Sequence, residues 1–211
     1  MEPLILYDFV TKKIFVKIIK SYLSLKIAFF ELLENACDNV SLSRRLGLNP
    51  KQIEVTMNDK EITIKNYGNV IPLIINPHYN KYVPDIIFGE LNIIGSFNDN
   101  YMYHNVRGAR FSNMISKSFH VKIQDKDKYY SRTWYDNMEK STVSIIRTTD
   151  TRESYVEITY VPNFQKCQIE KYPKYMIQLF AAYCISQSNK LKIPILFNDE
   201  YLTNHTYTDD H

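Results

Sequence analysis

Hydrophobic residues near the start of the chain recur at mostly helical intervals between Ile14 and about Val40. This spacing predicts a helix or a helix pair with one apolar face. Within it, the stretch "FFELLENACDNV" (residues 29–40) also carries polar residues, and those spaced four apart share a second face: Glu31, Asn35 and Asn39, with Asp38 beside them. This polar face is either a solvated stripe or a site.

The pattern beyond residue 50 predicts strands followed by a second major helix. Two alternating runs, "QIEVTMN" and "EITIKN", flank "DK" as in a β-hairpin, whereas "YGNVIPLIINPHYN" is typical of an irregular connection. Residues 83–107 are loop-rich, and a short helix is expected at "RFSNMISKS". Apolar residues return at helical spacing from Pro173 to about Asn189, before a last strand at "KIPILFN". Four strand-like runs with short links favour an antiparallel meander between these helices: "FHVKIQD", "YYSRTWYD", "STVSIIRT" and "YVEITYV".

These elements predict an α+β fold of two layers, with the helices on one face of a mixed, mainly antiparallel sheet. The chain has 211 residues, and no linker rich in proline, glycine or serine interrupts it. A chain of this length can bury one substantial core. We therefore expect residues 1–211 to form a single domain.

Composition narrows the class of protein. Hydrophobic residues make up 45% of the chain, which is typical of a packed globular protein, and the formal net charge of +3 does not favour a nucleic-acid-binding face. The three cysteines lack a C-x-x-C spacing, the histidines lack metal-ligand spacing, and no run reaches the ~18 apolar residues of a membrane span. We expect an intracellular protein, cytoplasmic or nuclear, with reduced thiols. Its richness in isoleucine, asparagine, lysine and tyrosine is typical of AT-rich genomes, such as those of many large DNA viruses or parasites.

Several segments occur in an order that resembles a known family. The family is the ATPase domain of eukaryotic and viral type IIA DNA topoisomerases, which have the Bergerat fold of the gyrase, heat-shock chaperone, histidine kinase and MutL (GHKL) superfamily. The resemblance extends from about residue 25 to Leu202. It rests on these segments: E-x-x-x-N-x-x-D-N on the first helix, "KNYGNVIP", "YVPDIIFGELN", "NVRGARFSNMIS" and "RTWYDNM".

The resemblance implies roles for the polar helix face. In the family the helix glutamate polarises the attacking water, and the asparagine four residues later coordinates the magnesium ion that bridges the nucleotide phosphates. At the matching positions, Glu31 would be the general base, Asn35 the metal ligand, and Asn39 a residue near the ribose or phosphates. Without the other matching segments, a solvated helix face would be the better interpretation.

The adenine end of the implied site is partly kept. The family's D/N-x-G-x-G turn corresponds to residues 66–70, so Asn66 would bond the adenine amino group and Gly68 would supply the turn. Val70 replaces the second glycine of this turn, and its branched side chain would narrow the pocket. Val156 stands where the family offers a threonine to the base.

The phosphate end of the implied site departs further from the family's sequence pattern. The family's loop G-G-R-N-G-Y-G-A-K corresponds to residues 102–110, "MYHNVRGAR", in which three of the four glycines are replaced. Such loops need glycine because the backbone must approach phosphate closely. The remaining candidate phosphate contacts are Asn105, Gly108 and Arg110, the last in the lysine position. The alternative is that Arg107 and Arg110 lie on an ordinary solvent face.

Two main functions follow from this resemblance. The first is a degenerate, free-standing domain that acts as a non-catalytic viral regulator through a protein partner or as a homodimer, without strong DNA binding. The second is a switch or weak ATPase that uses ATP and Mg²⁺, without DNA strand passage. We expect no transducer domain, which supplies a γ-phosphate lysine in the family, and no DNA-cleavage domain. Several contacts of one site are altered, and the loss of each would raise the catalytic barrier by ~3 kcal/mol. This favours the first function, that of a pseudoenzyme.

Overall fold

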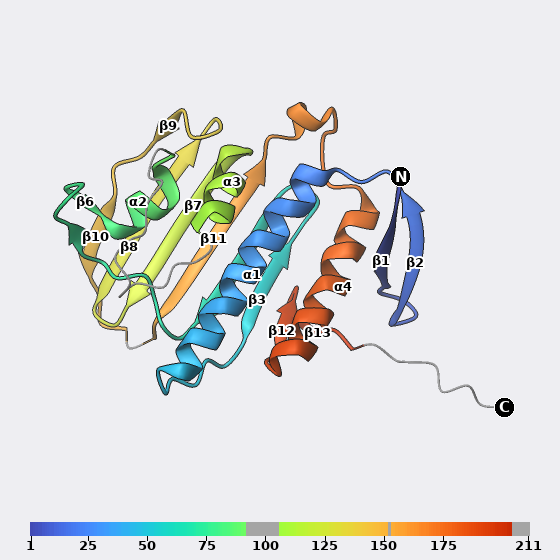
Figure 1. The fold of residues 1–211 in the computed structure, drawn as a ribbon, viewed down its shortest axis with the longest axis horizontal. Helices are drawn as coiled ribbons and strands as arrows, with labels where there is room; N and C mark the ends of the chain where they lie inside the picture. Colours follow the sequence, from blue (N-terminus) through green and yellow to red (C-terminus); the bar gives the residue numbers. More distant parts are fainter. Residues whose placement is uncertain (92–105, 152, 204–211) are drawn as a thin grey trace.

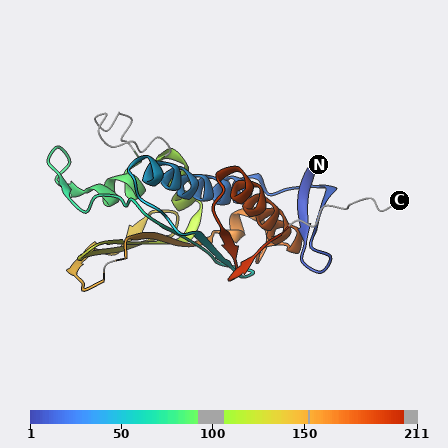
Figure 2. The same cartoon turned by 90° about the horizontal axis from the view of Figure 1, so that it is seen from below.

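The structure of the protein is a computed structural model that describes residues 1–91, 106–151 and 153–203. Figure 1 shows helices α1 (Leu23–Arg45) and α4 (Lys174–Leu191) side by side, running roughly along the strands of a large twisted sheet. After a quarter turn, Figure 2 shows these helices on one face of that sheet. The two-layer α+β prediction is therefore confirmed. None of the helices in the described part of the chain is long and apolar enough to cross a membrane.

The main sheet has nine strands in the order β10-β8-β7-β11-β4-β3-β12-β13, with β9 paired to β8. All its pairs are antiparallel except that of β12 with β3, which makes the sheet mixed. A separate small hairpin, β5 (Ile75–Asn76) and β6 (Lys81–Tyr82), lies outside it. The strands of the main sheet are β3 (Ile53–Met57), β4 (Ile62–Tyr67), β7 (Ser116–Asp125), β8 (Lys128–Tyr135), β9 (Lys140–Ser141), β10 (Ile145–Thr148), β11 (Tyr155–Pro162), β12 (Ile195–Phe197) and β13 (Glu200–Tyr201).

The core lies between the helices and the sheet. Alternation along β4 buries Ile62, Ile64 and Asn66 on one face, which is the face that α1 covers. The two long helices meet through stacked aromatic rings, with centroids 4.1 Å apart for Phe29 and Phe180. Burying a side chain of this size stabilises the fold by ~1.5–3 kcal/mol. Shorter helices at the edge of this layer are α2 (Val83–Gly89), α3 (Val106–Met114) and the 3-10 helix η1 (Phe164–Cys167).

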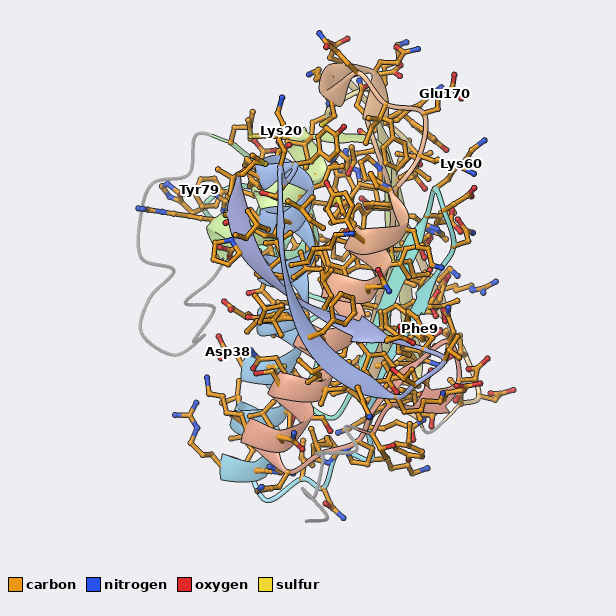
Figure 3. The ribbon with its side chains drawn as sticks, turned by 90° about the vertical axis from the view of Figure 1, so that its right-hand side faces the viewer. Phe9, Lys20, Asp38, Lys60, Tyr79 and Glu170 are labelled. Atoms are coloured by element: carbon orange, nitrogen blue, oxygen red, sulfur yellow. The ribbon has the colours of Figure 1, made fainter. Side chains whose placement is uncertain are left out.

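The prediction of a helix from Ile14 was wrong. Residues Lys13–Ile19 form strand β2, which pairs with β1 (Glu2–Asp8), and α1 begins only at Leu23 and continues past Val40 to Arg45. The segment is rich in isoleucine and valine, which favour strands, and periodicity alone does not separate a short apolar strand from a helix. Figure 3 shows this hairpin running across α4, with Phe9 near its turn.

The predicted meander holds for only part of the sheet. Strands β7, β8 and β10 are neighbours in chain order, but β11 lies between β7 and β4 and pairs with both. Because β11 returns to the middle of the sheet, its inward-facing residues lie beside those of β4, the strand that α1 covers.

Candidate functional site

A cavity of about 250 Å³ lies between α1 and the sheet. Helix α1 contributes Asn35 and Asn39 to its wall, and the sheet contributes Asn66 from β4 and Val156 from β11. Apolar residues of α2 and α3, among them Ala109, close another side. An apolar cavity with a few convergent polar groups is the usual form of a small-molecule site.

The helical spacing of the predicted site residues places two of them on this wall, because Asn35 and Asn39 line the cavity. Glu31 lies one turn earlier on α1, against Gly108 of α3, and is not among the lining residues. A Cβ atom added to Gly108 would lie 1.9 Å from Glu31 Oε2, so a residue larger than glycine there would displace the carboxylate. Gly108 therefore permits α3 to approach Glu31 directly.

Glu31 is the candidate proton acceptor. Its carboxylate makes no hydrogen bond or ion pair with any residue that the structure describes. Burial raises the pKa of Glu31, and the negative charge of Glu34 adds to this increase. A carboxylate with a raised pKa and no hydrogen-bond partner among the described residues is compatible with the predicted role of general base, which stays a prediction.

A hydrogen-bonded group of four residues, which we call the amide relay, joins α1 to the turn after β4: Asn39, Ser43, Asn66 and Asn69. Asn39 Nδ2 donates to the Asn69 carbonyl oxygen at 2.7 Å, and Asn39 Oδ1 accepts from Asn66 Nδ2 at 3.0 Å. Ser43 Oγ accepts from the Asn69 N–H at 2.8 Å and donates to Asn39 Oδ1 at 3.3 Å. Sequence reasoning missed Ser43 and Asn69, although Ser43 continues the four-residue spacing of Glu31, Asn35 and Asn39.

The turn after β4 depends on Gly68. Its φ of +116° is a conformation that side chains disfavour, and an added Cβ would lie 2.4 Å from Ser43 Oγ. Gly68 thus lets the turn approach the buried Ser43. Val70 is buried and is not among the residues that line the cavity, whereas Val156 is.

The predicted phosphate-binding residues are spread over several places. Arg110 is buried, and its Nε donates to the Ile87 carbonyl oxygen of α2 at 3.0 Å. Burial lowers the pKa of Arg110, the positive charge of Arg107 adds to this decrease, and the negative charge of Glu90 opposes it. Arg110 is not among the residues that line the cavity. Asn105 lies outside the described residues, so its predicted role stays a prediction.

The metal prediction for Asn35 fits the chemistry of its side chain. Asn35 lines the cavity and makes no hydrogen bond with any described residue, so its amide oxygen is available. Within residues 1–91, 106–151 and 153–203, no three His, Cys, Asp or Glu side chains are grouped as a metal site. Mg²⁺ is commonly held by one or two protein oxygens together with water and substrate phosphates, and Asn35 suits such a shared site.

Similar proteins were found among both solved structures and curated sequences. The ATPase region of Saccharomyces cerevisiae topoisomerase II superposes with a TM-score of 0.87 at 23% identity, over 96% of this chain and 55% of that chain. The 43K ATPase domain of Thermus thermophilus gyrase B gives 0.63 at 16% identity, over 84% and 45%.

Among curated proteins, the putative mitochondrial DNA topoisomerase 2 of Caenorhabditis elegans is 30% identical over 159 residues, 72% of this chain. The DNA topoisomerase 2 of Plasmodium falciparum is 33% identical over 147 residues, 65% of this chain. The chain spans only 13% and 10% of the length of these two relatives. No protein-family model matches the chain.

The structural matches show the fold, which is that of the GHKL ATPases. The sequence matches add the particular relationship. The chain is homologous to type II DNA topoisomerases, over the segment that folds as their ATPase domain.

Proposed function

We propose that this chain binds ATP with Mg²⁺ in the cavity beneath α1 and works as a ligand-responsive, topoisomerase II-like domain whose turnover is slow or absent. The observation that carries the proposal is the open cavity itself. It is lined by the amides of Asn35, Asn39 and Asn66. Glu31, whose carboxylate makes no hydrogen bond with the described residues, lies one turn before Asn35 on α1. Similar structures described as ATPase regions support the choice of ATP.

Each of these side chains has a distinct task in the proposal. Asn66 bonds the base, Asn35 offers an oxygen to the metal, and Glu31 orients water for attack. The magnesium ion would supply charge neutralisation of the phosphates. Glu31 and Asn35 lie on successive turns of one rigid helix, which keeps the water-orienting and metal-binding groups at a fixed separation.

Slow turnover is proposed because two phosphate-binding features are altered. Three of the four glycines of the family's loop are replaced in residues 102–110, and Arg110 is held by the Ile87 carbonyl oxygen and is not part of the cavity lining. Losing one preorganised contact to the reacting phosphate commonly costs ~3 kcal/mol of barrier, or about a hundredfold in rate. Binding depends less on these contacts than catalysis does.

Isothermal titration with ATP, with and without MgCl₂, followed by a phosphate-release assay, tests the proposal. We expect magnesium-dependent binding by the wild type, at least about tenfold weaker binding by Asn35→Ala, and unchanged binding by Glu31→Gln. Asn189→Ala removes an exposed asparagine on α4 and is the matched control. No ATP binding by the folded wild type would overturn the proposal. Rapid turnover that disappears in Glu31→Gln would overturn its slow-turnover part.

A second candidate function is protein binding through the β1–β2 hairpin. Ile5 and Val16 are paired across the two strands and therefore share a face, on which both are exposed, at 56% and 66%. Ile18 extends this exposed apolar surface on β2, also at 66%. Clusters of exposed apolar residues are typical of protein interfaces. We propose a second copy of this chain as the partner.

A further inference from the structure

We propose that the amide relay fixes the orientation of Asn66, so that the cavity selects a purine carrying an amino group over one carrying a carbonyl group at the same position. Asn39 and Ser43 are then positioning residues for base recognition. This inference rests on the proposed nucleotide binding and specifies how the base is chosen.

The orientation of the Asn39 amide is set by the backbone carbonyl group of Asn69. The Asn69 carbonyl oxygen can only accept a hydrogen bond, so Asn39 must direct Nδ2 toward it, as the 2.7 Å distance indicates. Asn39 Oδ1 then points the other way. Ser43 reinforces this arrangement, because its hydroxyl oxygen accepts from the Asn69 N–H and its proton is left to donate to Asn39 Oδ1.

The orientation of Asn39 determines that of Asn66. Asn39 Oδ1 can only accept, so Asn66 must present Nδ2 to it, at 3.0 Å. The Oδ1 atom of Asn66 makes no hydrogen bond with any residue that the structure describes. Since Asn66 lines the cavity, this oxygen, which can only accept, is left for a ligand.

Because its neighbour in the cavity wall is apolar, the acceptor oxygen of Asn66 determines which ligand group can form a hydrogen bond there. Val156 is the cross-strand partner of Asn66 on β11, and its side chain offers no hydrogen bond to a ligand. An unrestrained asparagine could rotate its amide and serve an amino or a carbonyl group equally well. Here rotation would place Asn66 Oδ1 against Asn39 Oδ1, two oxygens with no proton between them, so the relay opposes it.

The test compares ATP with inosine triphosphate, in which a carbonyl group replaces the amino group of adenine and the adjacent ring nitrogen carries a proton. Titration calorimetry with MgCl₂ gives the ratio of their dissociation constants. We expect the wild type to bind ATP about tenfold or more tightly than inosine triphosphate, because the latter faces an unmatched acceptor. In Asn39→Leu the ratio should fall toward one, since Asn66 is then free to rotate. Ser43→Ala should lower it less.

Two further variants separate recognition from general structural damage. Asn66→Asp in the Asn39→Leu background should restore the preference for ATP, because a carboxylate only accepts hydrogen bonds. Ser188→Ala is the matched hydroxyl deletion, because Ser188 donates to the Ile193 carbonyl oxygen at the end of α4, away from the relay. The ratio of dissociation constants for the two nucleotides should be the same in this variant as in the wild type. A loss of packing lowers both affinities together and leaves their ratio unchanged.

Circular dichroism and thermal unfolding establish that each variant is folded, and Asn39→Ala replaces Asn39→Leu if the latter does not fold. Equal wild-type affinity for the two nucleotides, or an unchanged ratio in the Asn39 variants, would overturn the relay's role while leaving nucleotide binding intact. Failure of the folded wild type to bind either nucleotide would instead overturn the proposed function.

Discussion

Glu31 lies against Gly108 with no hydrogen-bond partner among the described residues, and this position affects stability as a function of pH. Burial, followed by the charge of Glu34, raises the pKa of Glu31 in the folded chain. The folded state therefore binds a proton more tightly than the unfolded state. The stabilisation from this proton is complete below the unfolded pKa of about 4.3 and is lost as the pH rises through the folded pKa.

Glu31→Gln should consequently raise the free energy of unfolding relative to the wild type at neutral and alkaline pH. This difference should disappear below about pH 4, where the wild-type carboxyl is protonated in both states. Urea unfolding at several pH values measures it. Glu170→Gln, at the exposed position labelled in Figure 3, is the control and should change stability by less than about 0.5 kcal/mol at every pH. A Glu31→Gln effect that is the same at acid and neutral pH would contradict the prediction.

Helical spacing predicted the residues that the structure places on one face of α1. Residues four apart must share a face, so Glu31, Asn35 and Asn39 were predictable, and Ser43 continues the same series. Asn69 was not predictable, because it enters the relay through its backbone groups, which every residue has. The direction of the Arg110 side chain could not be predicted from the sequence either, since it depends on where α2 places the Ile87 carbonyl oxygen.

At the scale of elements, alternation predicted strands where one face is buried and the other is not. Strand β4 shows this regularity, and its pattern placed Asn66 on the helix side. The pattern fails for β2, whose residues are all exposed or half-buried, so no buried face constrains them to alternate. The position of β11 between β7 and β4 depends on pairing with residues far away in the sequence, which local patterns do not show.

Helix α2 is anchored to the sheet by a buried carboxylate, and this anchor gives a prediction for stability. Asp85 Oδ1 accepts from Tyr130 at 2.7 Å and from Ser144 at 2.7 Å, and it pairs with Arg132 at 2.8 Å. Removing one partner of a buried pair leaves the other charge uncompensated, at a cost of ~3–5 kcal/mol. We expect Asp85→Ala to lose a free energy of unfolding near the lower end of this range, because Arg132 retains some contact with solvent.

Urea unfolding of Asp85→Ala, compared with Lys140→Ala as the control, measures how much the Asp85 carboxylate contributes to the free energy of unfolding. Lys140 forms an exposed ion pair with Asp136 at 2.9 Å, and such pairs contribute less than about 1 kcal/mol. Similar losses in the two variants would show that α2 does not depend on the carboxylate. A large loss in Asp85→Ala alone would show that it does.

At the scale of the whole molecule, the β1–β2 hairpin is a two-stranded sheet separate from the main one. It is held by its contact with α4, by the ion pair of Lys26 with Glu2 at 2.7 Å, and by the hydrogen bond from Tyr7 to the Thr203 carbonyl oxygen. Its inner residues are therefore fixed, while Ile5, Val16 and Ile18 remain exposed on the outside. An exposed apolar strand at the edge of a sheet can serve as a template for pairing with another chain.

Pairing of β2 with β2 of a second copy, in antiparallel orientation, would join the two hairpins into one four-stranded sheet with twofold symmetry. We expect the wild type to show a concentration-dependent dimer in sedimentation velocity, and Val16→Lys to remain monomeric because it places like charges opposite each other across the axis. At a position that is 66% exposed, this change should alter the stability of the monomer little. Val143→Lys, on an 85% exposed valine between β9 and β10, carries the same charge change and should still dimerise. A wild type that stays monomeric at every concentration would contradict the prediction, and loss of the dimer in both variants would assign the effect to net charge instead of to the hairpin.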